Sequence, residues 1–371
     1  MITRVEYNEQ KYGSEGAAMA EPRLKELDGL RGLAALWVVI FHLTFGFSHL
    51  WAPGRPLLIA AVVPFSVNIR GLQAVDLFFI ISGFVICMTV DRSRTVIDFA
   101  ASRFARLFPA YWAAVAISTA IGLLLPSTRL PVTVGQGLIN LSMLQSYIGV
   151  PLVDPSYWSL SFELGFYGLM AGILIGGCRH RIESIGLAWM VGGFALSSLL
   201  RQMGLAVPWR VSTALALPYA SLFYAGILFY RLKADQFTWM RVWLLVLCLV
   251  LRCAPEGSLV RGIECSLFLI FALAVAGRLP VLGTRPMAFL GSISYSLYVI
   301  HQPMGYRIEV GLHALDAPAW INLAASVTAL IAVAFVLNYV VERPGTRLLR
   351  QLYSAFRSSA VATRHASPDH G

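Results

Sequence analysis

The sequence predicts an all-α protein that crosses a membrane many times as a bundle of transmembrane helices. Hydrophobic residues make up 57% of the 371 positions and charged residues only 13%, about half the charged fraction of a typical soluble domain. The mean hydropathy is +0.69, and long apolar stretches recur along the whole chain. So few polar side chains could not cover a soluble globule of this size, which excludes an ordinary soluble enzyme, a coiled coil and a disulfide scaffold.

Ten stretches have the apolar character of a spanning helix, which needs about 20 residues. We expect these helices near residues 29–50, 72–90, 108–126, 159–177, 184–200, 211–230, 241–254, 262–277, 288–305 and 319–341. The segment 135–150 carries several amide and hydroxyl side chains, so we interpret it as re-entrant or interfacial. The spans form one membrane domain, 27–344, between an N-terminal tail, 1–26, and a largely disordered C-terminal tail, 345–371.

The distribution of positive charge predicts which side of the membrane holds the chain ends. Ten spans place both termini on one side, and if that side is the cytoplasm, most of the 29 lysines and arginines fall in cytoplasmic segments. This is the bias that the positive-inside rule describes. The net charge of +10 therefore indicates basic loops beside anionic lipid, with no nucleic acid as partner.

The first predicted span carries two ionisable side chains on one face. Arg31 and His42 are eleven residues apart, a spacing that returns to nearly the same helical face about 16 Å further along the axis. Ionisable groups at membrane depth are costly, so each is a candidate functional residue. His42 is either a catalytic imidazole or a buried histidine bonded to a neighbouring helix.

Two other predicted spans carry ionisable side chains to the same depth. His42 lies about 20 Å above the inner face, and Glu163, on a helix that runs inward, lies about 6 Å below the outer face of a core about 30 Å thick. His301 reaches a similar level. Glu163 could orient the His42 imidazole and raise its basicity; the alternative is a polar network with a structural role.

Polar residues of the second and third spans complete the candidate set. Arg103 and Arg106 share a helical face at the cytoplasmic start of the third span, where they either bind phosphate or serve topology alone. Asp76 is an interfacial cap or a site residue, and the Ser82–Gly83 pair permits close helix packing or contacts substrate. No helix shows paired ligand residues at metal-binding spacing, so no metal site is predicted.

Six short motifs follow one another along the chain. They are Arg31 and His42 with ten residues between them, the FFxxSGF segment at 78–84, the RxxRxxPxY segment at 103–111, the WSLxxE segment at 158–163, the SYSLYxxHxP segment at 294–303, and the Glu-Arg-Pro at 342–344. In this order they resemble the acyltransferase 3 family of bacterial membrane proteins. Many members carry a second acidic residue where this chain has Leu164, which leaves Glu163 as the carboxylate of that motif. We interpret Glu-Arg-Pro as a helix stop.

The resemblance implies an O-acyltransferase in the inner membrane of a bacterium. Its donor would be an acyl-CoA, usually acetyl-CoA, used as a co-substrate from the cytoplasm with no bound cofactor, and its acceptor a hydroxyl of a cell-surface or lipid-linked carbohydrate. Arg31, Arg103 and Arg106 would hold the CoA phosphates. His42, oriented by Glu163, would act as general base or as transient acyl carrier. The motifs also imply supporting roles for Tyr111, Trp158, Ser159, Tyr298 and His301.

The alternative function is a secondary transporter or flippase for a lipid-linked sugar. Ten helices with buried ionisable residues and Gly- or Pro-broken spans suit that class as well. Transporters, however, commonly contain internal repeats, and the sequence shows none at a fixed period. Loss of acyl transfer in a His42→Ala protein that still moves the sugar lipid would distinguish the two functions.

Overall fold

The computed structural model describes residues 24–46, 73–125, 131–315 and 318–366, and this part of the chain contains helices but no strand. The longer helices are α2 Lys25–Phe41, α6 Gln73–Arg92, α7 Val96–Leu124, α10 Trp158–Ile175, α11 Ile182–Gln202, α13 Ala220–Ala234, α14 Trp239–Cys253, α15 Ser258–Val275, α16 Arg285–His313, α17 Ala319–Leu337 and α18 Arg343–Ala366. The shorter ones are α8 Val134–Asn140, α9 Gln145–Ile148 and α12 Trp209–Ala214. The all-α prediction is therefore confirmed, although residues 47–50 of the first predicted span lie outside the described part.

Seven helical segments of the described chain are long and apolar enough to cross a membrane. They are Lys25–Thr44, Gln73–Arg92, Val96–Leu124, Pro155–Ile175, Arg179–Gln202, Ser258–Val275 and Ala319–Ser359. The three other predicted spans correspond to α13 and α14, with 15 residues each, and to α16, which carries several charged residues. A helix of 15 residues is about 22 Å long, so the count of ten spans stays a prediction.

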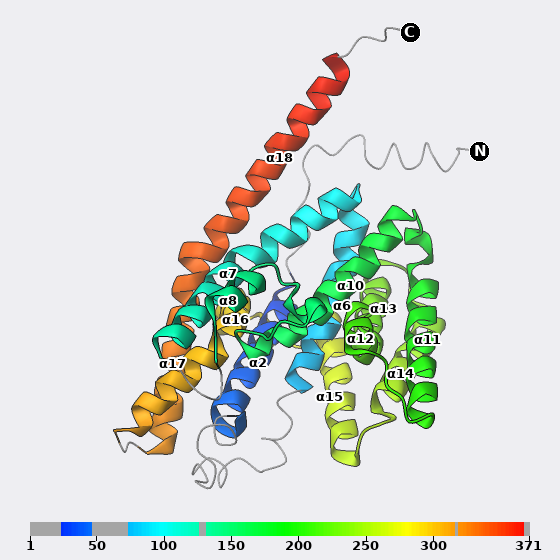
Figure 1. Cartoon of the computed structure of the whole chain (residues 1–371). Helices are drawn as coiled ribbons and strands as arrows, with labels where there is room; N and C mark the ends of the chain where they lie inside the picture. The colour runs from blue at the N-terminus through cyan, green and yellow to red at the C-terminus, as the bar shows by residue number, and fades with distance from the viewer. Residues whose placement is uncertain (1–23, 47–72, 126–130, 316–317, 367–371) are drawn as a thin grey trace, which may run out of the picture.

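The helices pack around α2, α6 and α16 (Figure 1). α2 runs alongside α16, and α6 lies against α13, while α16 also contacts α7 and α17. α2 and α16 run in the same direction, because residues further along α2 meet residues further along α16: Arg31 bonds to Ser294, and His42 to His301. The first predicted span thus turns its polar face towards a single partner helix.

The contact between α6 and α13 is a backbone-to-backbone contact. A Cβ atom on Gly83 would lie 2.1 Å from the carbonyl oxygen of Phe223, and one on Gly226 would lie 2.1 Å from that of Ile80. Only glycine allows such an approach, as in other closely packed membrane helices. Of the two roles considered for Gly83, close packing is the one observed.

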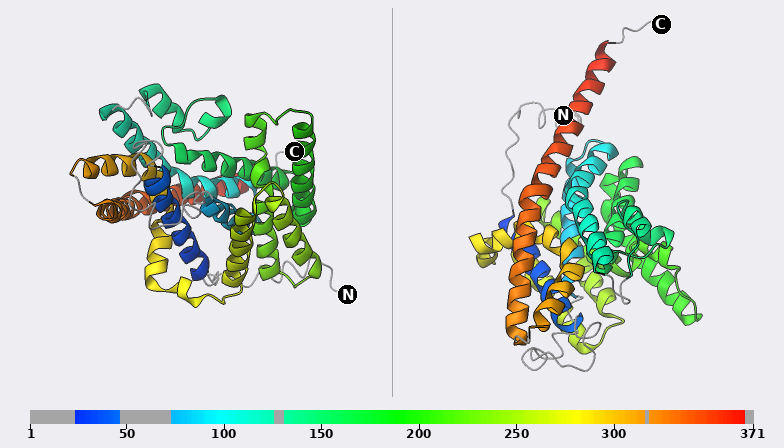
Figure 2. Two further views of the ribbon diagram at one scale, coloured as in Figure 1. Left: turned by 90° about the horizontal axis from the view of Figure 1, so that it is seen from below. Right: turned by 60° about the vertical axis from the view of Figure 1, so that its left-hand side comes forward.

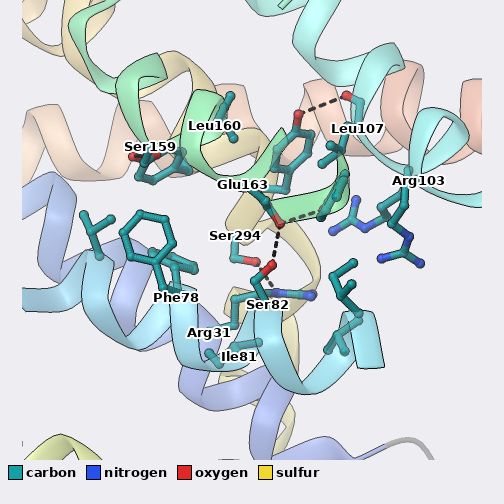
Figure 3. A pocket seen from close by; sticks show the side chains of 18 residues that line it. Arg31, Phe78, Ile81, Ser82, Arg103, Leu107, Ser159, Leu160, Glu163 and Ser294 are labelled. Atoms are coloured by element: carbon teal, nitrogen blue, oxygen red, sulfur yellow. Dashed lines mark hydrogen bonds between the residues drawn. The ribbon is translucent and has the colours of Figure 1, made fainter. Parts of the chain in front are cut away.

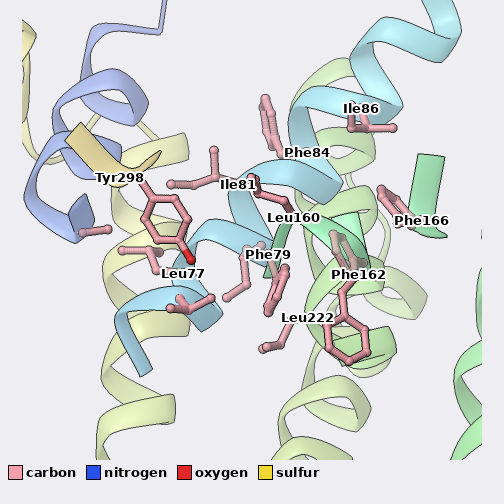
Figure 4. Packing of buried hydrophobic residues seen from close by; sticks show 14 of the residues in the cluster. Leu77, Phe79, Ile81, Phe84, Ile86, Leu160, Phe162, Phe166, Leu222 and Tyr298 are labelled. Atoms are coloured by element: carbon pink, nitrogen blue, oxygen red, sulfur yellow. The ribbon is translucent and has the colours of Figure 1, made fainter. Parts of the chain in front are cut away.

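Aromatic side chains fill the space around this contact (Figure 4). The Phe166 and Phe223 rings stack with their centroids 4.2 Å apart, and the ring centroids of Phe79 and Tyr219 are also 4.2 Å apart. Trp158 packs edge-on against Phe79 and lies 5.7 Å from Tyr219. Since aromatic pairs contribute beyond the area they bury, this cluster holds α6, α10 and α13 in fixed relation.

The C-terminal part of the chain differs from the prediction. α17 continues through a π-helical turn, Asn338–Glu342, into α18, which extends to Ala366 and projects from the body (Figures 1 and 2). The predicted helix stop at Glu-Arg-Pro and the predicted disorder of 345–371 are therefore wrong up to Ala366. Pro344 directly follows the π-helical turn, where the regular hydrogen-bond ladder of the helix is already interrupted, so a residue without an N–H is tolerated there.

The polar segment 135–150 forms two short helices, α8 and α9, with seven and four residues. Neither is long enough to span a bilayer, so the segment adds no eleventh span. The buried Tyr111 hydroxyl on α7 donates to the Asn140 carbonyl oxygen at 2.8 Å and accepts from Gln145 Nε2 at 3.2 Å. Tyr111 therefore anchors this segment to α7, and it does not line the cavity described next.

Candidate active site

A cavity between α2, α6, α7, α10 and α16 brings together many of the candidate residues (Figure 3). Its lining includes seven of the candidates, namely Arg31, Ser82, Arg103, Arg106, Ser159, Glu163 and Tyr298. These residues come from five helices that are far apart in the sequence. The grouping of arginines with a carboxylate and hydroxyl groups in one cavity is the central feature of the site.

Glu163 presents a carboxylate to the middle of this cavity. Its Oε1 atom accepts hydrogen bonds from Ser82 Oγ at 2.9 Å and from the Tyr167 hydroxyl at 2.7 Å. Tyr167 lies one helical turn further along α10, on the same face. Both bonds converge on one oxygen, so among the described residues Oε2 has no hydrogen-bond donor and faces the cavity. It is the oxygen available to a substrate.

The arginines line the cavity next to Glu163. Arg106 is paired with Glu342, and its guanidinium lies 5.2 Å from the centroid of the Tyr295 ring. Arg31 donates to Ser294 Oγ at 2.9 Å and to the Gly291 carbonyl oxygen at 3.0 Å. α2 and α16 thus hold the Arg31 guanidinium between them.

Arg103 differs from the other two arginines. Its contact with a described residue is a 3.3 Å hydrogen bond to the neighbouring Ser102 hydroxyl, and its buried Nε atom has no partner in the described part of the chain. A buried donor without a partner costs free energy unless a ligand binds it. Arg103 is therefore the cation of this cavity with the most capacity to bind an anion.

His42 and His301 form a pair next to Tyr298, outside the cavity lining. His42, at the start of the π-helical turn after α2, has its Nδ1 atom 2.9 Å from the Val38 carbonyl oxygen and 3.1 Å from His301 Nε2. The buried His301 has its Nδ1 atom 2.6 Å from the Tyr298 carbonyl oxygen. The two ring centroids are 4.9 Å apart.

These contacts assign the protons of the two neutral rings. A carbonyl oxygen only accepts, so both Nδ1 atoms carry hydrogen and both Nε2 atoms carry a lone pair. His301 Nε2 then accepts from His42 Nδ1, which also donates to the Val38 carbonyl oxygen. No described residue bonds to His42 Nε2, so this atom is left as a free base.

The geometry corrects the predicted orientation of His42 by Glu163. Val38 and His301 are the partners of the imidazole, whereas Ser82 and Tyr167 are the partners of the carboxylate. Counting residues gave both groups similar depths, but depth along an axis does not fix the lateral position of a side chain. The alternative of a histidine bonded to a neighbouring helix thus describes the surroundings of His42 correctly.

Tyr298 connects the histidine pair to the cavity. Its side chain lines the cavity, while its carbonyl oxygen receives the His301 Nδ1 proton. The Tyr298 hydroxyl donates to the Ser156 carbonyl oxygen at 3.0 Å and lies 2.5 Å from Ser159 Oγ. Tyr298 and Ser159 therefore form a fixed wall between α10 and α16, and both hydroxyl groups are already hydrogen-bonded.

Five of the predicted supporting residues lie away from the cavity lining, and one of them is His301. Gly83, Tyr111 and Trp158 serve packing and anchoring, as described above. The buried carboxylate of Asp76, in the first turn of α6, pairs with Arg252 at 2.6 Å. Within the described ranges, no three His, Cys, Asp or Glu side chains come close enough to hold a metal ion.

Three residues of the site were absent from the candidates that the sequence provided. Tyr167 could have been found from its i,i+4 spacing to Glu163. Tyr295 faces Arg106 from α16, and Glu342 accepts from Arg106, from Ser296 and from Asn338. Glu342 is 236 positions from Arg106, so no local pattern could have revealed the pair.

The turn that leads into α10 contains a buried carboxyl outside the membrane-spanning segments. Asp154 Oδ1 accepts from the backbone N–H of Ser156 at 2.8 Å and from its hydroxyl at 2.7 Å, whereas Oδ2 has no partner among the described residues. Burial disfavours the charged form and raises the pKa of Asp154 to about 7. Its protonation state therefore changes near neutral pH.

This shift predicts a pH-dependent stability. The folded-state pKa lies above the unfolded value near 3.8, so the folded protein binds more protons between these values and loses stability as pH rises from about 4 to 7. The loss amounts to about 4 kcal/mol at most. Thermal unfolding in detergent should show this decline in the wild type but not in Asp154→Asn, which keeps the cap without the charge. Identical pH profiles would contradict the prediction.

Together, the helices and the cavity define a membrane protein with an internal site that is rich in arginine and also contains a carboxylate. A family model described as an acyltransferase domain matches residues 24–342. The chain belongs to this family, acyltransferase 3, and the resemblance of its motifs is confirmed.

Several curated proteins are similar to this chain. The exopolysaccharide production protein ExoZ of Rhizobium meliloti is 28% identical, with 80% of this chain and 95% of that protein covered. The acyltransferase MdmB of Streptomyces mycarofaciens is 28% identical, with 88% and 92% covered. A Bacillus subtilis protein named "Putative peptidoglycan O-acetyltransferase YrhL" is 25% identical to this chain. The match covers 86% of this chain but only 54%, about half, of the Bacillus protein. The comparison with solved structures gave no match.

Proposed function

We propose that the protein is a membrane-embedded O-acyltransferase. It moves an acyl group, which we propose to be acetyl, from acyl-CoA to a hydroxyl of a cell-surface or lipid-linked carbohydrate. Family membership supports the reaction class, and the names of relatives that concern exopolysaccharide and peptidoglycan support the acceptor class. The observation that carries the proposal is the cavity in which Arg31, Arg103 and Arg106 stand beside Glu163.

The proposal includes an orientation in the membrane. Ten spans in the inner membrane of a bacterium, with cytoplasmic termini, place the start of α7 and its two arginines at the cytoplasmic mouth of the cavity. The CoA phosphates bind these guanidinium groups, and the pantetheine arm extends inward past Glu163. Arginine suits this task because its planar group binds phosphate bidentately.

His42 performs the chemistry in this proposal. As a base, its Nε2 atom removes the proton from the acceptor hydroxyl, the hydroxyl oxygen attacks the thioester carbonyl, and the proton passes to the CoA thiolate as the C–S bond breaks. As an acyl carrier, Nε2 attacks the thioester carbonyl itself and releases CoA, and the acceptor hydroxyl then takes the acyl group from the ring. His301 and Val38 hold the ring in the required tautomer in both cases. Glu163 contributes its free Oε2 atom as a hydrogen-bond acceptor for the donor. Its partners Ser82 and Tyr167 fix the direction of this oxygen, so the group is preorganised before substrate arrives.

The experiment that tests the function follows the acyl group from donor to acceptor. Membranes with and without the protein receive acetyl-CoA labelled in the acetyl group, and surface glycans are then analysed by mass spectrometry. We expect labelled sugars, in which one acetyl group replaces one hydroxyl hydrogen, only in the membranes that contain the protein. Unlabelled glycans, together with altered movement of a lipid-linked sugar, would instead favour the transporter alternative.

A further inference from the structure

α18 lies along the cytoplasmic half of α7 and runs in the opposite direction. Near the start of α18, a Cβ atom on Gly345 would lie 2.7 Å from Pro109 Cβ. Further along, Tyr353 donates to Asp98 Oδ1 at 2.7 Å, and Arg357 donates to the same atom at 2.9 Å. These contacts set the register of the two helices at both ends.

The register places Arg350 opposite the arginines of α7. Arg350 lies between Gly345 and Tyr353 on α18, just as Arg103 lies between Pro109 and Asp98 on α7. It is three residues before Tyr353, hence within about 60° of the face that meets α7. Consistent with this position, Arg350 experiences electrostatic repulsion from both Arg103 and Arg106.

Positive charge at this place exceeds the negative charge that balances it. Arg106 is paired with Glu342, but neither Arg103 nor Arg350 forms an ion pair with any described carboxylate. Three guanidinium groups therefore lie near two carboxylates, Glu342 and Glu163 of the adjoining cavity, and the buried Nε atom of Arg103 lacks a hydrogen-bond acceptor among the described residues. Like charges held together in this way are stabilised by a bound anion, and phosphate groups fit several arginines best.

We propose that Arg350 binds a phosphate group of the acyl donor together with Arg103 and Arg106, so that α18 forms one wall of the donor site. The inference rests on the proposed function, in which the donor is acyl-CoA, and it assigns a role to a helix outside the matched family domain, which ends at residue 342. The donor is favoured over a lipid headgroup because Arg103 and Arg106 line the same cavity as Glu163.

The test measures how the donor concentration affects the rate for the full-length protein. Four forms of the protein are reconstituted in phosphatidylcholine nanodiscs and assayed with acetyl-CoA. They are the wild type, Arg350→Ala, Arg350→Lys and Arg347→Ala. Arg347 is the matched control, since it is an arginine of α18 that is exposed, as Arg350 is, but points about 120° away from Tyr353. None of these exchanges removes a buried contact, so all variants should fold.

We expect Arg350→Ala to raise the KM for acetyl-CoA roughly tenfold with little change in kcat, the effect of losing one hydrogen bond to a charged group. Arg350→Lys should recover part of this loss because it keeps the charge. Arg347→Ala should keep the wild-type KM. Equal KM values for Arg350→Ala and Arg347→Ala would overturn the proposal.

Two further measurements separate the possible causes of failure. Nanodiscs with anionic phosphatidylglycerol test whether the phosphate bound by Arg350 belongs to a lipid. If Arg350→Ala changes the KM only in these discs, Arg350 binds a lipid headgroup, and its role in donor binding is overturned. Binding of labelled acetyl-CoA to the wild-type protein tests the donor itself. If the wild type binds it and Arg350→Ala binds it equally well, the role of Arg350 alone is wrong; if the wild type does not bind it, the proposed function also fails.

Discussion

Replacing His42 by Gln should reduce kcat for acyl transfer by about 10²–10⁴-fold, the usual contribution of a general acid–base group. Glutamine is similar in size and can still donate to the Val38 carbonyl oxygen, but it offers no basic nitrogen in place of Nε2. The protein should therefore remain folded while transfer is lost. The measurement is the initial rate with labelled acetyl-CoA, at equal amounts of monodisperse protein.

Two other histidine exchanges serve as controls for His42. His180 is exposed in the turn before α11, and His180→Gln should leave the rate unchanged. His301→Phe removes the acceptor of the His42 Nδ1 proton and keeps an aromatic ring, and because His301 is a positioning residue the exchange should cost less, about 10–100-fold. A His42→Gln protein with near wild-type kcat would refute the role of this imidazole.

The labelled donor also separates the two roles considered for His42. If the imidazole carries the acyl group, wild-type protein incubated without acceptor should retain label that His42→Gln does not. If it acts only as a base, neither protein should retain label, while transfer in the presence of acceptor should still depend on His42. Both outcomes preserve a catalytic His42 but assign it different chemistry.

The helical pattern of the sequence was sufficient to predict which face of the first span is functional. Arg31 and His42 share a face by their spacing of eleven residues, and the structure shows both directed at α16. The pairing of His42 with Glu163 was wrong because the rise per residue gives depth alone. The lateral position of the Glu163 side chain depends on how α10 packs against its neighbours, and this packing brings Glu163 to Ser82 instead.

The C-terminal helix could have been predicted from its own pattern. Exposed Leu348, Leu352 and Phe356 recur every fourth residue on α18, the period of an amphipathic helix, yet the polar end of the chain favoured the interpretation of disorder. By contrast, the pairing of Glu342 with Arg106 arises only when α17 packs near α7, and no spacing in the sequence encodes it.

A second polar cluster joins α6, α14 and α15, and it should dominate stability. Arg252 of α14 contacts Asp76 at 2.6 Å, Glu264 at 3.1 Å and Glu256 at 3.1 Å. Asp76 and Glu264 are almost fully buried, and Glu264 accepts no hydrogen bond from the described residues. One guanidinium is thus the cation shared by carboxyl groups of α6, of α15 and of the turn between α14 and α15.

Replacement of Arg252 by Leu should lower the free energy of unfolding by about 3–5 kcal/mol, since it leaves two buried carboxyl groups without their cation. The measurement is denaturant- or heat-induced unfolding in detergent, with Arg201→Leu, an exposed arginine without an ion pair in the described chain, as the control. The triple variant Asp76→Leu, Arg252→Leu, Glu264→Leu should regain most of the loss, because well-packed apolar side chains replace a buried ion cluster at little cost. If Arg252→Leu unfolds like the control, the cluster does not hold the N-terminal end of α6. The positions of Phe78 and Ser82 in the cavity would then depend on the glycine contacts with α13 and on the aromatic cluster around Phe79.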